Sequence, residues 1–264
     1  LLADNERGKT IIIKIADRVV ELPTSTENGH FESIIVISAD DVAEHVDDGF
    51  IHFTAVTRGT ESRVFGGTIR LLGPDGLSVI SDIDDTVKVS YVTHRKSLLE
   101  HTFLLDFVAA PGMSERYRDW ASNDMGFHFV SSSPWHLYEP LSEFLDQNDF
   151  PWATFSLKSI RFRDETLLDL FKKGTETKPA AIKKILDRYP ERQFVLIGDS
   201  GEQDPEVYAA LLRERPQQIL KVYIRLITRE HAGNERFKRV FDGIDPDCWQ
   251  LFEDPSTLGL PSER

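Results

Sequence analysis

An acidic cluster at the end of an apolar segment offers the clearest chemistry in the sequence. The segment that begins at Leu77 runs into three carboxylates and one hydroxyl, those of Asp82, Asp84, Asp85 and Thr86. Carboxylates crowded at the carboxyl end of a strand repel one another, so they need a cation or a proton nearby. Two aspartates separated by one residue can offer Mg²⁺ a side-chain oxygen and a backbone carbonyl oxygen. The simpler alternative is an acidic β-turn, in which aspartate is common.

Three serines, residues 131–133, end a second apolar segment that begins at Phe127. Ser131 falls at the predicted carboxyl end of this strand, so we expect its hydroxyl to face the site. Ser133 precedes Pro134 and has the pattern of a helix N-cap followed by proline at the first helical position. Hydroxyl and amide donors at a helix N-terminus form a natural site for phosphate oxygens.

A third apolar segment, Phe194–Gly198, also ends in acidic residues. Because open parallel sheets place their ligands at the carboxyl ends of strands, Asp199 would meet Asp82 and Asp84 there and complete a metal shell. Asp204 is a further candidate ligand. Its position also suits the N-cap of the helix that follows.

A lysine beside these carboxylates would balance both the acidic cluster and an incoming phosphate. Lys178, at the predicted start of a helix over residues 179–189, is the first candidate, although a lysine in that position is commonly a solvated charge. Lys158 is the competing candidate.

The elements that must position these side chains alternate between strands and helices from Leu77 onward. Strands are predicted over residues 77–83, 127–131, 152–157, 194–198 and 219–227. Helices are predicted over residues 95–108, 113–123, 134–147, 179–189 and 204–213. Strands covered by helices on both faces read as apolar runs, as these do. The pattern predicts an α/β fold with a doubly wound parallel sheet.

The first part of the chain has a different pattern and predicts a small antiparallel, sandwich-like β domain over residues 1–76. Its expected strands are residues 10–15, 31–37, 50–56 and 63–72, separated by turn-prone runs. The α/β domain then occupies residues 77–264. A mostly helical insertion over about 89–126 is placed to act as a lid that excludes water.

The composition limits the classes of function. The 264 residues are 40% hydrophobic and 28% charged, as in a soluble globular protein, and no segment approaches the roughly 20 apolar residues of a membrane span. A net charge of −13 disfavours nucleic-acid binding. The single cysteine, Cys248, excludes an intrachain disulfide. Because the chain starts at Leu1 without methionine, we expect an upstream piece to be missing, and we expect a cytoplasmic protein that binds membranes peripherally.

The order of the motifs is more specific than any one of them. Asp-x-Asp-x-Thr, then serine, then lysine, then Gly-Asp-x4-Asp resembles the pattern of the haloacid-dehalogenase-like phosphatases. Residues 82–88, 131–135 and 197–206 are closer still to the catalytic domain of the actin-patch phosphatidate phosphatases, and the resemblance covers about residues 77–227. It implies a haloacid-dehalogenase-like domain with a small cap and Mg²⁺-dependent hydrolysis of phosphatidate, at a membrane surface, to diacylglycerol.

The residue types predict phosphoryl transfer through a covalent intermediate on Asp82. Asp84 would protonate the leaving group and then activate water, while Ser131 and Lys178 hold the phosphoryl oxygens. The candidate metal ligands are Asp82, Asp84, Asp199 and Asp204. Thr86 is expected to bind substrate or to lock its loop through a backbone hydrogen bond. The other candidates for substrate binding are Ser132, Arg161 and Arg163.

Three alternatives remain at this stage. The first is a phosphatase for small soluble phosphomonoesters, which would share the catalytic domain but not the lipid substrate. The second is a response-regulator receiver, although receivers carry an adjacent acidic pair one strand before the phosphorylated aspartate. The third is a non-catalytic binding module on the same scaffold, which the complete set of motif acids disfavours.

Overall fold

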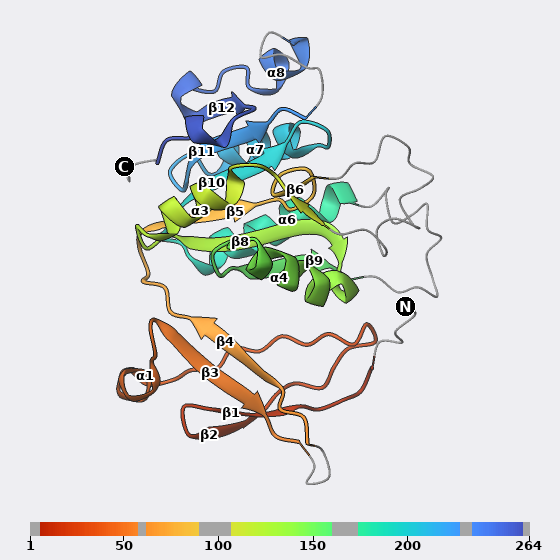
Figure 1. Cartoon of the computed structure of the whole chain (residues 1–264), viewed down its shortest axis with the longest axis vertical. Coiled ribbons are helices and arrows are strands. Elements are labelled where there is room, and N and C mark those ends of the chain that lie inside the picture. Colours follow the sequence, from red (N-terminus) through yellow and green to blue (C-terminus); the bar gives the residue numbers. More distant parts are fainter. Residues whose placement is uncertain (1–5, 58–61, 90–106, 160–173, 228–233, 261–264) are drawn as a thin grey trace. The chain divides into compact units, whose positions relative to one another are not determined.

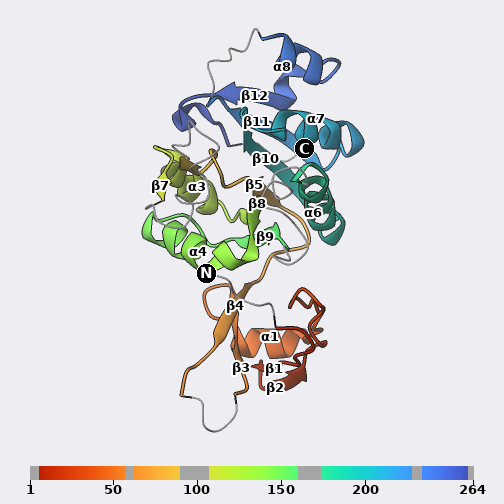
Figure 2. The same cartoon turned by 90° about the vertical axis from the view of Figure 1, so that its right-hand side faces the viewer.

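The chain forms two compact units in the computed structural model. The model describes residues 6–57, 62–89, 107–159, 174–227 and 234–260. Among these residues, those up to Gly73 belong to the smaller unit together with Ser159, and the others belong to the larger unit. Figures 1 and 2 show each unit from two sides. The division into domains at residue 76 stays a prediction.

The larger unit is built on a six-stranded sheet whose strands all run parallel (Figure 1). In chain order the strands are β5 (Leu77–Ser81), β8 (Gly126–Pro134), β9 (Thr154–Lys158), β10 (Gln193–Asp199), β11 (Ile219–Arg225) and β12 (Trp249–Phe252). Across the sheet their order is β9-β8-β5-β10-β11-β12, so the chain reverses its direction of winding between β5 and β10. Ligands of such sheets bind at the carboxyl ends of the strands at this switch point. The predicted doubly wound α/β fold is confirmed.

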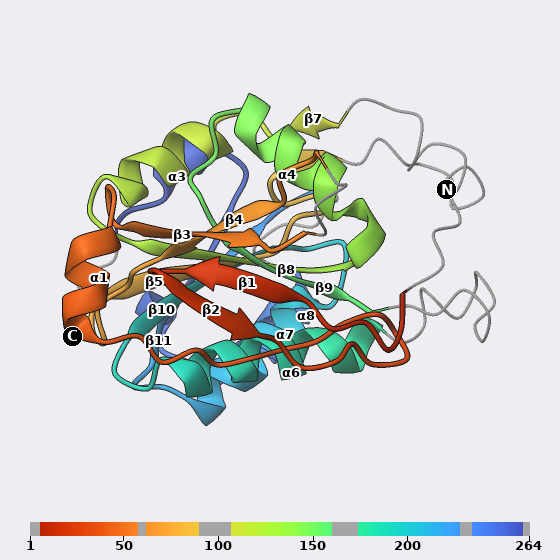
Figure 3. The ribbon, with the colours of Figure 1, turned by 90° about the horizontal axis from the view of Figure 1, so that it is seen from below.

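Helices cover both faces of this sheet (Figure 3). Among the described residues the four longest helices are α3 (Met113–Ala121), α4 (Tyr138–Gln147), α6 (Gly174–Arg188) and α7 (Asp204–Glu214). Val79 of β5 belongs to the core formed with α3 and α4, whereas its neighbour Ile80 belongs to the core formed with α6 and α7. Because successive side chains of a strand point to opposite faces, the apolar run of β5 serves both cores at once.

Several element boundaries differ from the predicted ones. Helix α6 begins at Gly174 and continues through Pro179, which removes one backbone hydrogen bond without ending the helix. Strand β8 continues to Pro134, so the helix predicted from that residue begins later. The predicted helix over 95–108 lies largely outside the described residues, as do residues 90–106 of the lid predicted over 89–126. The rest of that segment includes α3, whose Met113, Tyr117 and Trp120 pack in the core of the larger unit. The remaining short elements are β6 (Lys88–Val89), β7 (Val108–Ala109), α8 (Glu235–Val240), and the 3₁₀ turns η1 (Trp135–Leu137), η2 (Pro246–Cys248) and η3 (Pro255–Thr257).

The smaller unit contains one antiparallel sheet of order β2-β1-β3-β4. Its strands are β1 (Ile12–Ile15), β2 (Arg18–Glu21), β3 (Phe50–Ala55) and β4 (Gly66–Arg70). The predicted strand over residues 31–37 is wrong. Those residues do alternate, because Ile35 and Ile37 pack on the small core while Ile34 is 84% exposed, but they join no ladder. Helix α1 (Ala39–His45), which Ser38 caps, was not predicted.

His128 is a buried, uncharged group in the middle of the larger sheet. It lies on β8 with 2% of its surface exposed and packs against the rings of Tyr189 and Phe194. Its Nδ1 is 2.7 Å from Oγ1 of Thr154, and its Nε2 has no hydrogen-bond partner among the described residues. Burial, with Arg192 and Arg188 nearby, lowers the pKa of His128 from 6.5 to about 4. The folded protein therefore resists protonation at this residue.

We expect acid to destabilise the protein through His128. Between pH 6.5 and about 4 the unfolded chain binds a proton at His128 that the folded chain excludes. The contribution of His128 to the free energy of unfolding is therefore fully present above pH 6.5 and is lost as the pH falls toward 4. The loss is on the order of 3 kcal/mol by pH 4. His128→Asn should show a smaller acid loss when the free energy of urea unfolding is measured across this range. Identical pH slopes in the two proteins would contradict this assignment.

Candidate active site

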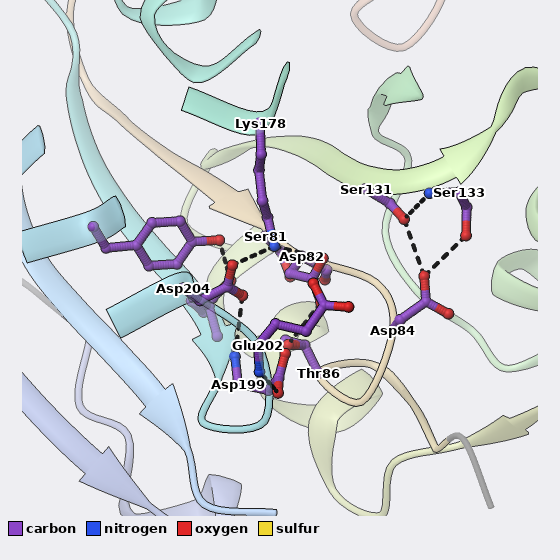
Figure 4. A network of polar contacts seen from close by, with 12 residues as sticks. Ser81, Asp82, Asp84, Thr86, Ser131, Ser133, Lys178, Asp199, Glu202 and Asp204 are labelled. Carbon is purple, nitrogen blue, oxygen red and sulfur yellow. Dashed lines mark hydrogen bonds and ion pairs between the residues drawn. The ribbon is translucent and has the colours of Figure 1, made fainter. Parts of the chain in front are cut away.

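The predicted residues Asp82, Asp84, Ser131 and Asp199 gather at the carboxyl ends of β5, β8 and β10 (Figure 4). Asp82 follows β5 directly, and its backbone N–H donates to the carbonyl of Ile197 at 2.9 Å. Asp199 is the last residue of β10, the strand that pairs with β5. The switch point of the sheet therefore brings together two aspartates that are far apart in the sequence.

Asp82, the predicted nucleophile, is one of three buried carboxylates in this cluster, with Asp199 and Asp204. It is 2% exposed, and its two oxygens have different donors. Oδ1 accepts from Nζ of Lys178 at 2.9 Å, and Oδ2 accepts from Oγ1 of Thr86 at 3.2 Å. Burial raises the pKa of Asp82 well above its usual range, the carboxylates of Asp204, Asp199 and Asp84 raise it further, and Lys178 opposes them. The anionic form of Asp82 therefore needs positive charge nearby.

Lys178 supplies one such charge from inside the structure. It lies in α6 with 6% of its surface exposed, and its Nζ contacts carboxylate oxygens of both Asp82 and Asp204. Burial alone would lower the pKa of Lys178, but Asp204 and Asp82 raise it well above its usual value, so the ammonium stays charged. Lys178 sits inside the helix rather than at its first residue. Lys158, the competing candidate, ends β9, which pairs with β8 and not with β5.

Asp199 carries an oxygen suited to a cation. Its Oδ1 accepts from the backbone N–H of Gly201 at 2.6 Å and of Glu202 at 3.2 Å. Its Oδ2 is buried and has no hydrogen-bond partner among the described residues. Burial, followed by the charge of Asp204, raises the pKa of Asp199 to about 7. One oxygen from each of Asp82, Asp199 and Asp204 lies within 4.8 Å of the others, and a hard cation such as Mg²⁺ prefers this donor set. The residues therefore fit a magnesium site.

Asp204 has a structural partner as well as a place in this cluster. Its Oδ2 accepts from the backbone N–H of Asp199 at 3.2 Å. The alternative that Asp204 caps α7 is wrong, because the residue before the helix is Gln203 and no side chain caps it. A Cβ added to Gly198 would lie 2.1 Å from Oδ2 of Asp204. Only glycine therefore leaves room for this carboxylate against β10.

Asp84 is held by three donors on the other side of the nucleophile. Its Oδ2 accepts from Oγ of Ser131 at 3.0 Å and from Oγ of Ser133 at 2.9 Å (Figure 4). Its Oδ1 is 2.6 Å from Nζ of Lys88. Burial would raise the pKa of Asp84, but Lys88 and the two hydroxyls outweigh it and hold the pKa below its usual value. Asp84 is therefore an anion in this arrangement.

The serine triplet differs from its prediction at one position. Ser133 lies within β8 and binds Asp84, so its predicted role as an N-cap is wrong; the residue before the 3₁₀ turn η1 is Pro134. Ser131 faces the site, as expected, and its Oγ also accepts from the N–H of Ser133 at 2.9 Å. Ser132 is partly buried on the same strand. Its role in binding substrate stays a prediction.

Other predicted contacts are buried or lie outside the described residues. Thr86 is fully buried and donates to the carboxylate of Asp82, not to a backbone group as one alternative expected. Arg161 and Arg163 lie outside the described residues. Lys88 was not predicted, although its position four residues after Asp84 was a signal for this contact.

Comparisons with known proteins place these residues in a family. The family model for the catalytic domain of phosphatidate phosphatase APP1 matches residues 77–226. An uncharacterised protein of Schizosaccharomyces pombe is 30% identical over 174 residues, which cover 65% of this chain and 28% of that protein. Phosphatidate phosphatase APP1 of Saccharomyces cerevisiae is 33% identical over 160 residues, which cover 58% of this chain and 26% of that protein.

One solved structure has a low overall likeness to the chain. The D,D-heptose 1.7-bisphosphate phosphatase of B. bronchiseptica, crystallised with magnesium and phosphate, has a TM-score of 0.38 and 15% identity. The match covers 69% of this chain and 94% of that chain. A likeness at this level bears no weight for the chemistry of the site.

The curated relatives are much longer than the region that they share with this chain. The shared region spans only about a quarter of each relative's length. The family model nevertheless covers more than half of the chain, and all of the clustered residues Asp82, Asp84, Ser131, Lys178, Asp199 and Asp204 lie within the match. The predicted relationship is confirmed. The chain belongs to the family of the phosphatidate phosphatase APP1 catalytic domain.

Proposed function

We propose that the larger unit is a Mg²⁺-dependent phosphatase that hydrolyses phosphomonoesters through an aspartyl phosphate on Asp82, with phosphatidate as its substrate. One observation carries the proposal. The buried carboxylate of Asp82 is fixed by Lys178 and Thr86 near Oδ2 of Asp199, which has no hydrogen-bond partner in the described part of the chain, and the carboxylate of Asp84 lies two residues further along. A nucleophile, a fixed cation, a vacant ligand oxygen and an acid–base group are the parts that phosphoryl transfer through a covalent intermediate requires.

The first step forms a bond between an oxygen of Asp82 and phosphorus and breaks the bond to the leaving oxygen. Thr86 and Lys178 hold the carboxylate in one orientation, so the attacking oxygen is positioned before the substrate arrives. The ammonium of Lys178 also offsets the negative charge that a phosphate brings to an acidic site. Water then attacks phosphorus, releases phosphate and restores Asp82.

Asp84 donates a proton in the first step and accepts one in the second. It is anionic in the described arrangement, so it must take up a proton before it can protonate the leaving oxygen. A phosphoryl oxygen that binds Ser131 would take this donor away from Asp84 and make protonation easier. Once the leaving group has gone, the anionic Asp84 accepts a proton from the attacking water.

Asp82 and Asp199 would hold Mg²⁺, with Asp204 within reach and with the backbone carbonyl of Asp84 as the predicted additional ligand. The ion would neutralise charge, so that an anionic nucleophile can approach an anionic substrate. Its binding would also lower the raised pKa values of Asp82 and Asp199, because a nearby cation favours the charged form of a carboxylate.

Phosphatidate is proposed from the family to which the chain belongs and from the relative that is named for this activity. No helix in the described part of the chain has the length and apolar character needed to cross a membrane. On our proposal, the protein meets its lipid substrate by peripheral binding at a cytoplasmic membrane surface. A chain of net charge −13 needs a local basic rim to approach an anionic lipid. Arg161 and Arg163 are proposed for that rim. The runner-up is a soluble small-molecule phosphomonoesterase.

Asp82→Asn should abolish turnover without unfolding the protein. Asparagine nearly preserves the volume of the side chain but removes the nucleophile, so kcat should fall by at least about 1,000-fold. The melting temperature should not fall, because a neutral amide avoids the burial of a charge. Steady-state kinetics with an aryl phosphate and thermal unfolding would measure both effects.

Asp85→Asn is the matched control for that variant. Asp85 lies in the same turn at φ 56°, a conformation that asparagine also tolerates, and it belongs to no part of the proposed machinery. Its kcat should stay within about fivefold of wild type. A loss of only a fewfold in Asp82→Asn, or equal losses in the two variants, would contradict covalent catalysis by Asp82.

The substrate assignment predicts a preference for lipid over its soluble head group. Phosphatidate in mixed micelles should be hydrolysed with a higher kcat/KM than glycerol 3-phosphate, because the acyl chains add binding energy that the head group lacks. Release of inorganic phosphate measures both reactions under the same conditions. A higher kcat/KM for glycerol 3-phosphate would favour the soluble phosphomonoesterase instead.

A further inference from the structure

Arg236 holds the loop that carries the acidic residues of β10 and α7. It lies at the start of α8, beyond the residues that the family model matches. Its Nε and Nη2 donate to the two carboxylate oxygens of Glu206, each at 2.8 Å. Nη1 donates to the carbonyl of Ser200 and Nη2 to the carbonyl of Glu202, both at 2.6 Å. One guanidinium therefore ties α8 to the first turn of α7 and to two carbonyls of the loop between β10 and α7.

A single peptide group links this guanidinium to Asp199. The carbonyl of Ser200 and the N–H of Gly201 belong to the same planar trans peptide and point in opposite directions. The carbonyl accepts from Arg236, while the N–H donates to Oδ1 of Asp199 at 2.6 Å. Fixing the carbonyl thus fixes the donor that engages Oδ1. The other oxygen of Asp199, Oδ2, is left buried and without a hydrogen-bond partner among the described residues.

The packing around Gly201 leaves this peptide little room to move. A Cβ at this position would lie 3.0 Å from Oδ1 of Asp199 and 2.5 Å from Cδ1 of Ile227. The loop and the start of α7 are also strongly acidic, with carboxylates at Asp199, Glu202, Asp204 and Glu206. Lys178 contacts Asp204 from the interior, and Arg236 contacts Glu206 on the outer side. The guanidinium therefore supplies both directed donors and countercharge.

We propose that Arg236 is a positioning residue for the cation site, acting through the Ser200–Gly201 peptide to direct Oδ2 of Asp199 toward a bound Mg²⁺. The proposal rests on the proposed function, because it takes the Asp82 and Asp199 carboxylates as ligands. Residues that orient metal ligands in this way commonly change metal affinity by 10- to 100-fold when they are replaced.

Arg213 offers a matched control. It also joins α7 to the segment around α8, since its Nη2 donates to the carbonyls of Val240 at 2.7 Å and Asp242 at 2.9 Å. Both bonds lead away from the acidic loop. Arg213→Gln should therefore loosen the same segment without disturbing Asp199.

The experiment is calorimetric titration of MgCl₂ into the full chain, for wild type, Arg236→Gln, Arg213→Gln and Asp199→Asn, with a thermal melt of each. Arg236→Gln should raise the Kd for Mg²⁺ by about tenfold or more, while Arg213→Gln stays within about twofold of wild type. Similar melting temperatures in the two glutamine variants would separate affinity from stability. Arg236→Lys keeps the charge, but an ammonium cannot bind Glu206 and both backbone carbonyls together, so the Mg²⁺ affinity of this variant should also fall. This variant replaces Arg236→Gln if the glutamine variant does not fold.

Two results would overturn the inference while leaving the proposed function in place. The first is unchanged Mg²⁺ affinity in Arg236→Gln when Asp199→Asn abolishes binding. The second is wild-type affinity in Arg236→Lys, which would mean that charge alone suffices. Mg²⁺ binding that persists unchanged in Asp199→Asn, or no binding by wild type, would overturn the metal site itself and this inference with it.

Discussion

The structure depends on the crowding of three buried carboxylates around one lysine. Asp82, Asp199 and Asp204 bring oxygens within 4.8 Å of one another, and Lys178 contacts two of the three. Burial raises the pKa values of Asp82 and Asp199, so one ammonium does not fully balance the cluster. A site of this kind favours an additional cation, and the same cation makes Asp82 available as an anion. The repulsion within the carboxylate cluster and its proposed chemistry therefore have a common cause.

The fold holds these mutually repelling carboxylates close together with strands and helices at a single edge of the sheet. Strands β5 and β10 pair directly, so the residues that end them are held in register by backbone hydrogen bonds. Helix α6 brings the lysine from one crossover, and the first residue of α7 brings Asp204 across Gly198 from another. Each carboxylate then has a donor of its own, from Thr86, Gly201 or Lys178. Sites built on strand ends and helices in this way lose little orientation to loop motion.

Asp84 has a separate electrostatic environment only two residues from the nucleophile. Lys88 and two serines hold its pKa low, whereas burial among acids holds the pKa of Asp82 high. Two carboxylates with opposite shifts are typical of sites that divide nucleophilic and proton-transfer roles between them. The backbone at Asp85 separates these two environments, because its left-handed conformation turns the chain after Asp84. The carbonyl of Asp85 accepts a hydrogen bond from Arg225 at 2.8 Å, which holds this turn.

The sequence predicted the parts of the site that follow buried strands, and missed the parts that depend on tertiary contacts. Asp82, Ser131 and Asp199 were predictable because an apolar run that stops at a polar residue marks both a strand and its carboxyl end. Ser133 was misassigned because a serine before proline usually caps a helix, and only the extension of β8 turns it toward Asp84. Arg236 lies 37 positions after Asp199 (236 − 199), and nothing in the local pattern links the two. The segment 31–37 has strand-like residues, but strand formation also needs a neighbour that local sequence cannot supply.

The central claim is that Asp82 becomes phosphorylated during turnover, and the most direct measurement is the mass of the enzyme trapped in that state. Asp84→Asn should react with an aryl phosphate, whose leaving group needs little protonation, and then hydrolyse the intermediate slowly because the base is gone. Intact mass after acid quench should show one added phosphoryl group, and peptide mapping should place it on Asp82. An adduct on any other residue, or measurable turnover of this variant with no adduct at any time after mixing, would contradict the account.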